Sequence, residues 1–204
     1  MMDDVYSVFI DTIGPPIHRQ EVPPSTIERY RRKLPKKLLE HWTTHGWCGY
    51  GDGIFWTVDP QEYEGVVASW IDGTSLAEHD TYHVIARGAF GDLYLYGERT
   101  GFSLCIASHI SHYCGNNRRI ANIDRHVQSF FLQVKKDSND FEDLFEPSRN
   151  NLGPLNHDEM YGFVPALDFG GKARLERIEK VKTIEHLIML SQLSALEPYS
   201  FSDF

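Results

Sequence analysis

Three short apolar segments follow one another so closely between residues 82 and 107 that few sheet topologies can accommodate them. β-Branched and aromatic residues mark the segments 82–89, 92–98 and 102–107, and glycine-containing turns separate them. Parallel neighbours in a sheet need a crossover connection of roughly a dozen residues or more, and these turns are far shorter. The spacing therefore predicts an antiparallel meander.

Segments with helical periodicity flank this meander on both sides. A capping box at Ser25 and Glu28 begins one expected helix, which runs to about residue 33, and Pro35 begins a second one that Gly46 ends. Further helices are expected over 60–71, 123–136 and 183–193. Helices gathered around an antiparallel sheet make an α+β fold, here with two closely associated subdomains.

The remaining segments are interpreted as connections and short strands. The residues before Pro24 are expected to form an extended lead-in. The glycine-punctuated stretch 47–53 is expected to be a loop before a strand at 54–58. The stretch 163–169 is expected to be a strand that ends in a turn at Gly170-Gly171, followed by a charged helix.

Charge and hydropathy restrict the class of partner and the compartment. The 204-residue chain carries 20 basic and 29 acidic residues, a net charge of −9, which disfavours nucleic-acid binding and favours a basic protein partner. No apolar run approaches the roughly 20 residues of a membrane helix. The N-terminus begins with acids where a signal peptide has positive charge, so a cytoplasmic protein without membrane contact is expected.

Two groups of residues could bind a metal ion, and neither is the preferred interpretation. His41 and His45 are four residues apart on an expected helix, but Trp42 stands where a zinc protease has its general base. We expect two partly exposed histidines near a helix C-terminus. His109, His112 and Cys114 have suitable donor atoms, but His109 falls on the other face of an extended segment and no fourth ligand is evident.

The sequence gives equally little support for a nucleotide-binding loop or a catalytic nucleophile. Gly49, Gly51 and Gly53 precede a strand, whereas a phosphate loop follows one, so a turn between aromatic side chains is expected. Gly170-Gly171 lacks the Lys-Ser/Thr of a P-loop. Cys48 has aromatic neighbours, which indicates an inert, buried thiol. The sequence thus predicts no catalytic residues, no cofactor and no metal.

Two acid-rich stretches are the candidate partner-binding segments. Residues 59–80 contain six acids and no Lys or Arg, and residues 137–159 contain seven acids and a single base, Arg149. Acids around aromatic anchors suit a basic protein partner, although both stretches could also be ordinary solvated faces. The candidate contact residues are Asp59, Glu62, Glu64, Asp72, Asp137, Asp140, Phe141, Glu142, Asp143 and Glu146.

A resemblance to a known family adds to these inferences. Residues 160–193 contain Tyr161-Gly162-Phe163, then Pro165-Ala166-Leu167, then Gly170-Gly171 and finally Glu185-His186-Leu187. This pattern resembles the C-terminal signature of a bacterial family that has a GAD-like N-terminal domain. The stretch 49–63, GYGDGIFWTVDPQEY, is similar to the N-terminal part of that family.

The resemblance implies a division of the chain and a function. It implies a GAD-like domain at 1–110, a C-terminal immunity-type domain at 111–197 and a tail at 198–204. Several family members are immunity proteins of type VI secretion systems, so the implied function is to bind and neutralise a cognate toxin encoded nearby. The resemblance also implies that the toxin is a nuclease, here expected to be a DNase, and the acidity of the chain agrees with inhibition by covering a basic active or DNA-binding surface.

Two other interpretations stay open. The N-terminal half also resembles SMI1/KNR4-like proteins in its general pattern, which would make the chain an intracellular scaffold or regulator with no toxin partner. The third is a metal-dependent enzyme that uses one of the two histidine groups described above.

Overall fold

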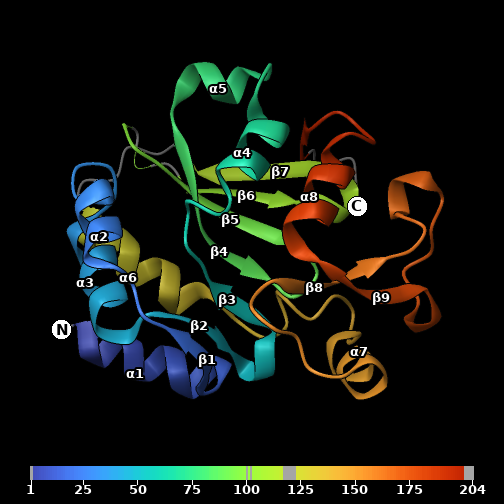
Figure 1. The fold of residues 1–204 in the computed structure, drawn as a ribbon, viewed down its shortest axis with the longest axis horizontal. Coiled ribbons are helices and arrows are strands. Elements are labelled where there is room, and N and C mark those ends of the chain that lie inside the picture. Colours follow the sequence, from blue (N-terminus) through green and yellow to red (C-terminus); the bar gives the residue numbers. More distant parts are fainter. Residues whose placement is uncertain (1, 100, 102, 117–122, 200–204) are drawn as a thin grey trace.

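The fold is that of a computed structural model, which describes residues 2–99, 101, 103–116 and 123–199. Its centre is a sheet of eight strands in the order β1-β2-β3-β4-β5-β6-β7-β10 (Figure 1). The strands are β1 (Pro16–Gln20), β2 (Trp47–Tyr50), β3 (Phe55–Thr57), β4 (Tyr82–Gly88), β5 (Asp92–Gly97), β6 (Ser103–Ala107), β7 (His112–Asn116) and β10 (Glu197–Pro198). Neighbours are antiparallel except β10, which runs parallel to β7.

A second, two-stranded antiparallel sheet extends the molecule beside the first. It pairs β8 (Glu159–Phe163) with β9 (Ile178–Lys182). The N–H of Tyr161 donates a 2.9 Å hydrogen bond to the carbonyl oxygen of Ala89, directly after β4, so β8 is joined to the end of the central sheet. The contact fixes the C-terminal part of the chain against the meander.

The helices cover the central sheet on two sides. They are α1 (Met2–Ile13), α2 (Pro24–Tyr30), α3 (Lys36–His45), α4 (Glu64–Ile71), α5 (Ser75–His79), α6 (Ile123–Gln133), α7 (Phe145–Leu152) and α8 (Thr183–Ser191). Helices α4 and α8 pack together on the face turned toward the viewer in Figure 1, whereas α6 lies behind the sheet with α1 and α3. The two faces of the sheet therefore carry different helices.

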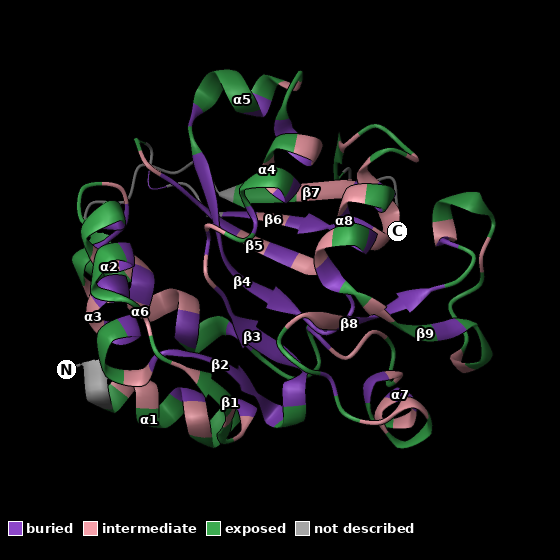
Figure 2. Ribbon diagram, viewed as in Figure 1, coloured by how far each residue is buried: buried purple, intermediate pink, exposed green. Residues whose placement is uncertain are grey.

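The core lies between these layers. Figure 2 shows the central strands buried along most of their length, with exposed residues on the outer sides of the helices. Aromatic side chains fill the back layer, where Phe9 of α1 contacts both Phe55 of β3 and Phe131 of α6, with ring centroids 6.0 and 5.2 Å apart. Burial of such large rings is the dominant stabilising term for a chain of this size.

The predicted fold class and meander are confirmed. The model is α+β with a mostly antiparallel sheet, and β4, β5 and β6 lie where short turns require them. The expected helix at 35–45 is α3, with Pro35 at its N-cap and Gly46 at its C-cap. Gly46 has φ 76°, a left-handed value that glycine adopts without a steric penalty. A Cβ atom there would lie 2.2 Å from the carbonyl oxygen of Gln20.

Several N-terminal predictions were wrong. Residues 2–13 form α1, not an extended lead-in, because Val5, Phe9 and Ile13 repeat every four residues and pack inward. The capping box is absent: α2 begins at Pro24, its cap makes no side-chain hydrogen bond, and the helix ends at Tyr30. The expected loop at 47–53 begins with β2, whose residues are buried because the strand pairs with β1 and β3.

The C-terminal signature also folds differently from expectation. The strand is β8, which ends at Phe163, and residues 167–169 form a single 3₁₀ turn, η3 (Leu167–Phe169). The charged segment after Gly170-Gly171 is not a helix. It forms a second 3₁₀ turn, η4 (Leu175–Arg177), and then β9, because Ile178 and Val181 pack against the core while the lysines and glutamate stay exposed.

Candidate functional site

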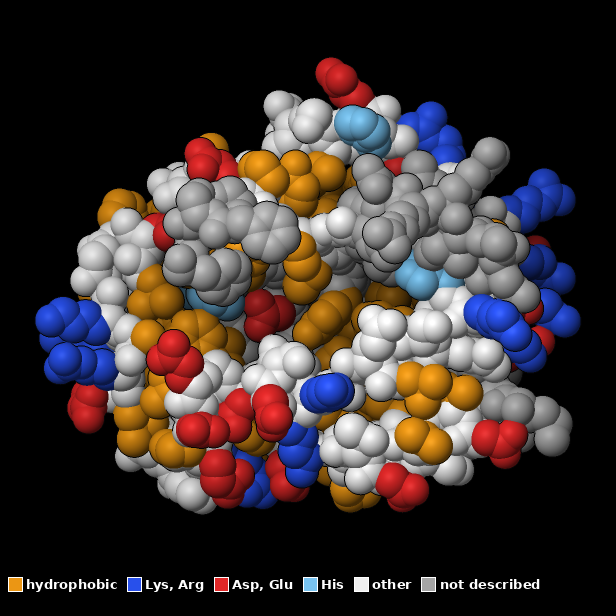
Figure 3. Space-filling model, turned by 180° about the vertical axis from the view of Figure 1, so that it is seen from behind, with side chains coloured by type: hydrophobic (Ala, Val, Ile, Leu, Met, Phe, Trp, Pro, Cys, Tyr) orange, Lys and Arg blue, Asp and Glu red, His pale blue; other side chains and the backbone are white. Residues whose placement is uncertain are grey.

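A groove hollows the back of the central sheet among the residues that the structure describes. Its volume is about 620 Å³, in the range of ligand and side-chain binding clefts. Strands β5, β6 and β7 form its floor and α6 forms one wall. Figure 3 views this face, where hydrophobic side chains line a hollow and acidic side chains gather beside it. We call this cleft the sheet groove.

A row of three side chains crosses the floor of the sheet groove. Tyr94 of β5 is opposite Cys105 of β6, which is opposite Cys114 of β7. Residues directly opposite one another in antiparallel strands point to the same face, so the phenol and both thiols lie on the groove side. Burial raises the pKa of Tyr94 well above its usual value, so the phenol stays protonated and acts as a hydrogen-bond donor.

The other wall of the sheet groove begins at Asn139, which lines it together with Ser138. The Tyr94 hydroxyl donates to Asn139 Oδ1 at 3.0 Å, and Asn139 Nδ2 donates to the carbonyl oxygen of Lys135 at 2.9 Å. Asn139 is only 2% exposed, so these bonds replace its lost contacts with water. They anchor the following segment, residues 137–146, to the sheet. We call that segment the acidic loop.

The acidic loop has an unusual backbone. Phe141, Glu142 and Asp143 have φ values of 50°, 56° and 63°, three consecutive left-handed residues without a glycine. Each costs roughly 1–2 kcal/mol relative to a right-handed conformation. The turn persists because Phe141 is held inward among Phe90, His109 and Phe163, at ring distances of 5.5, 4.7 and 4.8 Å. Strain of this kind is concentrated at functional sites.

The six candidate residues in the acidic loop therefore divide into two groups. Phe141 is an internal anchor, and Asp140 is half-buried with Oδ1 accepting the Phe145 N–H at 2.8 Å, at the start of α7. The others are exposed: Glu146, which lies 3.5 Å from Arg149, and the three acids Asp137, Glu142 and Asp143, which have no ion-pair partner among the described residues. The exposed carboxylates give the acidic loop its negative charge, and Ser138 and Asn139 of the same loop line the groove.

The second acid-rich stretch lies elsewhere. Asp59 and Glu62 precede α4, Glu64 begins that helix and Asp72 follows its end, so this set belongs to the front of the sheet (Figure 1). Glu64 is paired with Arg29 at 2.5 Å, and Asp59 is half-buried and accepts the Gln61 N–H at 3.0 Å. The structure thus separates the two candidate sets onto opposite faces, which the sequence did not indicate.

The two histidines of the first metal candidate differ in exposure: His45 is partly exposed, as expected, and His41 is packed in the core. His41 is 3% exposed, not partly exposed as expected, and its ring lies 4.4 Å from that of Phe131. Tyr6 of α1 stacks on His45 at 3.6 Å. Burial and the neighbouring His45 lower the pKa of His41 to about 3. The expectation of exposure was wrong for His41 because α1, which the sequence analysis missed, covers this side of the helix.

The second metal candidate is dispersed. His109 lies in the 3₁₀ turn η2 (Ser108–Ile110) with its ring against Phe141, whereas His112 and Cys114 lie in β7. Across the residues that the structure describes, no group of three or more His, Cys, Asp or Glu side chains is arranged to hold a metal ion. The donors were close in sequence, but the chain turns at Ser111, which has φ 53°.

The expected turn is confirmed for Gly51 and Gly53 but was wrong for Gly49, and the expected burial of Cys48 is confirmed. Gly49 is in β2 beneath the Trp56 ring, where a Cβ atom would lie 2.9 Å from ring carbons, and Gly51–Gly53 is a 3₁₀ turn, η1. Cys48 is 1% exposed, and burial raises the pKa of its thiol. Neither feature contributes to the sheet groove.

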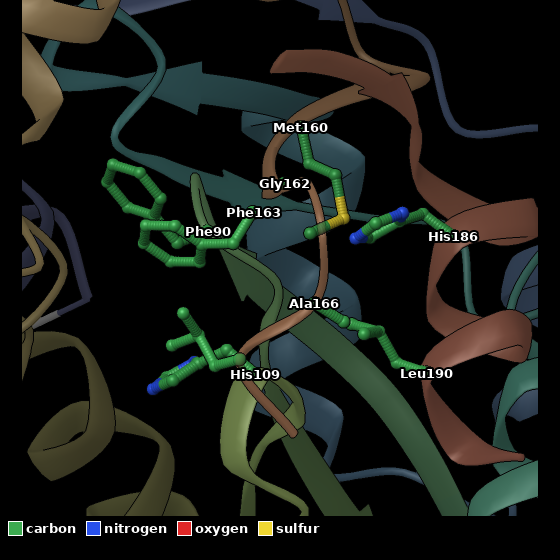
Figure 4. Close-up of a pocket in the computed structure, with 9 residues that line it drawn as sticks. Phe90, His109, Met160, Gly162, Phe163, Ala166, His186 and Leu190 are labelled. Carbon is green, nitrogen blue, oxygen red and sulfur yellow. The ribbon is translucent and has the colours of Figure 1, made fainter. Parts of the chain in front are cut away.

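A second, much smaller cavity lies where β8 meets α8. It has a volume of about 10 Å³, close to the minimum for one water molecule. Figure 4 shows Met160 and His186 on one side and Phe90, Phe163 and His109 on the other. Burial lowers the pKa of both His109 and His186, which favours the neutral rings that this apolar contact requires. The cavity is too small to hold a substrate.

Arg87 connects the front of the sheet to the C-terminal part of the chain. It is fully buried, and its Nη2 donates to the carbonyl oxygens of His157 and Glu159, both at 2.8 Å. Its guanidinium also lies 5.0 Å from the Trp56 ring. These partners satisfy a buried charge internally, so Arg87 is a structural element and not part of the groove.

The helices that the structure describes are all shorter or more polar than a membrane-spanning segment. Among curated protein sequences, none matches this chain significantly. The chain is similar in structure to Atu4351 from Agrobacterium tumefaciens, known from a crystal structure. The TM-score is 0.85 and the sequence identity 19%, over 97% of this chain and 93% of that one. At this identity the likeness concerns the fold.

Two family matches cover most of the sequence. The GAD-like domain matches residues 4–110, and the C-terminal domain of the T6SS immunity protein Tdi1 matches residues 124–194. The second match contains the whole acidic loop and much of α6. The chain belongs to the GAD-like domain family, and its C-terminal match supports a role as a type VI secretion immunity protein.

Proposed function

We propose that this protein binds a cognate toxin, a DNase, in the cytoplasm and neutralises it by covering its active or DNA-binding surface. One observation carries the proposal: the region that matches Tdi1-type immunity proteins supplies one wall of the sheet groove and the acidic loop, of which Ser138 and Asn139 line the groove. A DNase needs a basic surface to hold phosphate, and an acidic loop complements such a surface. The proposed mechanism is binding, with no substrate conversion by this chain.

The sheet groove and the acidic loop suit different parts of the contact with the toxin. The sheet groove offers apolar surface and a few fixed polar groups, which suit an anchor side chain of the toxin. Asp137, Glu142 and Asp143 offer exposed charge in the acidic loop, which speeds encounter with a basic partner. The strained backbone fixes the position of Glu142 and Asp143 before binding, so little entropy is lost there when the complex forms.

The α4 set remains a competing contact surface. Asp59, Glu62, Glu64 and Asp72 lie on the front, so a partner centred there would leave the sheet groove open. Asp59 and Glu64 are already engaged in internal contacts, which makes this set less suited to a new partner. The ten candidate residues thus give two surfaces that can be tested separately.

The two surfaces can be distinguished by matched charge reversals. One variant combines Glu142→Lys and Asp143→Lys, and the control combines Glu62→Lys and Asp72→Lys, two charge reversals each and all at exposed positions. We expect the loop variant to slow association with the toxin encoded nearby by about 10-fold or more at low salt, because electrostatic steering is lost. The control is expected to associate nearly normally. Association rates at two salt concentrations provide the measurement.

The results of these binding experiments distinguish the two contact surfaces, and they distinguish the immunity function from its alternative. A slow control with a normal loop variant would assign the contact to α4. If the unmodified protein neither binds the neighbouring gene product nor protects cells that express it, the immunity function is wrong. In that case a partner captured from cells lacking the neighbouring gene would favour the alternative of an intracellular SMI1/KNR4-like scaffold or regulator.

A further inference from the structure

Two of the three cysteines are direct neighbours across the sheet. Cys105 of β6 and Cys114 of β7 occupy opposite register positions, so their side chains are neighbours on the same face of the sheet. Cys48, by contrast, is buried in β2, near the other edge of the sheet. The pair lines the sheet groove, where Cys105 is half-buried and Cys114 is exposed. An oxidant from solvent can therefore reach one thiol, and the second is immediately available to it.

The type of strand pairing decides what bond the two thiols can form. The carbonyl oxygen of Tyr113 accepts a hydrogen bond from the Tyr199 N–H at 2.9 Å, so the backbone of Tyr113 faces β10. Successive residues of a strand face alternate sides, so the backbone of Cys114 faces β6, and Cys105 and Cys114 are a hydrogen-bonded pair. In such pairs the Cα atoms are about 5.5 Å apart.

This separation permits a disulfide, although not a relaxed one. A distance of about 5.5 Å lies within the usual Cα separation of disulfides, so no large backbone movement is needed. The Cβ atoms of a hydrogen-bonded pair are nonetheless farther apart than the roughly 3.8 Å mean of disulfides. Closing that gap strains the bond, and strained, accessible disulfides are the ones that cellular thiols reduce easily.

We propose that Cys105 and Cys114 form a reversible oxidation site, which hydroperoxides convert to a cross-strand disulfide within the sheet groove. The proposal does not depend on the immunity function. The Cys114 thiolate attacks the peroxide O–O bond and becomes a sulfenic acid as one water or alcohol leaves. The Cys105 thiol then displaces the sulfenic hydroxyl as a second water and closes the disulfide. The two sulfurs lose two electrons, which reduce the peroxide.

The assignment of roles to the two cysteines follows from their surroundings. The neighbouring Cys105 thiol lowers the pKa of Cys114 to about 7, because it stabilises the Cys114 thiolate. The same neighbour, together with burial, raises the pKa of Cys105. Cys114 is also the more exposed of the two. Exposure and thiolate character both favour Cys114 as the attacking sulfur and Cys105 as the resolving one.

The test maps disulfides in the full-length protein. Reduced protein is treated with hydrogen peroxide, blocked with an alkylating agent under denaturing conditions, digested and examined by mass spectrometry. We expect a cross-linked peptide pair that joins Cys105 to Cys114 and has lost two hydrogen atoms, while Cys48 is alkylated as in the untreated sample. Glutathione is expected to restore alkylation of all three cysteines.

Two variants test the order of events. Cys105→Ser is expected to accumulate a sulfenic acid at Cys114, detected by dimedone, whereas Cys114→Ser is expected to leave Cys105 largely unmodified. Cys48→Ala is the control and should form the same disulfide as the parent. The proposal is overturned if peroxide leaves both groove thiols free, or if the disulfides formed join different chains or involve Cys48. A bond that glutathione does not reduce would overturn its reversibility. The mapping of the unmodified chain decides these points even if a variant fails to fold.

Discussion

At the scale of single residues, buried polar side chains account for much of the specificity of this fold. Arg87 and Asn139 are both almost inaccessible to solvent, and each hydrogen-bonds to a segment far away in the sequence. Asn139 is bonded to Tyr94 and so positions the acidic loop, while Arg87 positions the residues before β8. His41 differs from both. Neither of its ring nitrogens has a hydrogen-bond partner among the described residues.

Because of His41, the free energy of unfolding depends on pH in the acidic range. Its folded pKa of about 3 is below the usual 6.5, so the unfolded chain takes up a proton between these values and the folded chain does not. Stability is therefore fully present above pH 6.5 and decreases as the pH falls toward 3, by up to about 1.4 kcal/mol per pH unit.

Replacing His41 tests this dependence. His41→Phe keeps an aromatic ring beside Phe131 and removes the titrating group, so we expect a shallower loss of stability between pH 6.5 and 4, measured from urea unfolding midpoints. Exposed His157→Phe is the control and should keep the parental slope. Identical slopes for the parent and His41→Phe would show that His41 does not contribute.

At the scale of elements, the acidic loop and the β8–α8 contact show how local conformation is imposed by packing. The loop keeps three left-handed residues because Phe141 is anchored inside the molecule. Strand β8 approaches α8 closely because Gly162 has no side chain: a Cβ atom there would lie 2.7 Å from Nε2 of His186. For each of these two contacts we predict how a substitution changes the stability of the protein.

Relief of strain in the acidic loop should increase stability. Glu142→Gly removes the Cβ atom that disfavours a φ of 56°, and we expect a gain of about 1 kcal/mol in the free energy of unfolding. Glu142→Ala removes the same charge but keeps the Cβ atom, so it isolates the backbone effect. Equal unfolding midpoints for the two variants would contradict the left-handed conformation.

Glycine substitutions should have opposite effects at two positions. Gly162→Ala forces β8 away from His186, and overpacking of this kind costs about 1–3 kcal/mol. Gly65→Ala in α4 places its Cβ atom in open space and is expected to stabilise the helix by about 0.5–1 kcal/mol. Thermal unfolding of both variants checks the pair. A neutral Gly162→Ala would mean that β8 and α8 are less tightly packed than described.

At the scale of the whole molecule, the two family matches do not correspond to two separate sheets. The division into residues 1–110, 111–197 and a tail at 198–204 stays a proposal. Strand β7 lies beyond the GAD-like match, yet it pairs along its full length with β6. Helix α6 belongs to the C-terminal match and packs against α1 and α3. The central sheet thus extends beyond the GAD-like match, and its back layer combines helices from both matches.

Truncation tests whether the N-terminal region folds alone. A fragment of residues 1–110 lacks β7 and α6, which leaves the edge of β6 unpaired and the aromatic back layer uncovered. We expect it to aggregate or to lose cooperative unfolding, because such edges pair with other chains. Size-exclusion chromatography and circular dichroism against the full-length protein provide the measurement. A monomeric fragment with a sharp transition would establish an independent domain.

Much of this architecture could be predicted because it depends on local chain geometry. The turns around 89–92 and 97–101 are too short for a crossover, which determined an antiparallel meander, and Pro35 and Gly46 determined both ends of α3. The acidity and the family resemblance were also properties of the sequence. Helix α1 was missed although its apolar residues repeat with helical spacing, and β9 was missed because its charged residues resembled an exposed helix.

What only the tertiary structure decided is which distant residues meet. It placed the two acid-rich stretches on opposite faces, turned Phe141 inward and buried His41 beneath α1. It also brought Tyr94, Cys105 and Cys114 into one row along the sheet groove. Such contacts depend on strand register and on helix packing between segments far apart in the chain. No local sequence pattern specifies these long-range contacts, because each depends on how many residues from different segments pack together in the core.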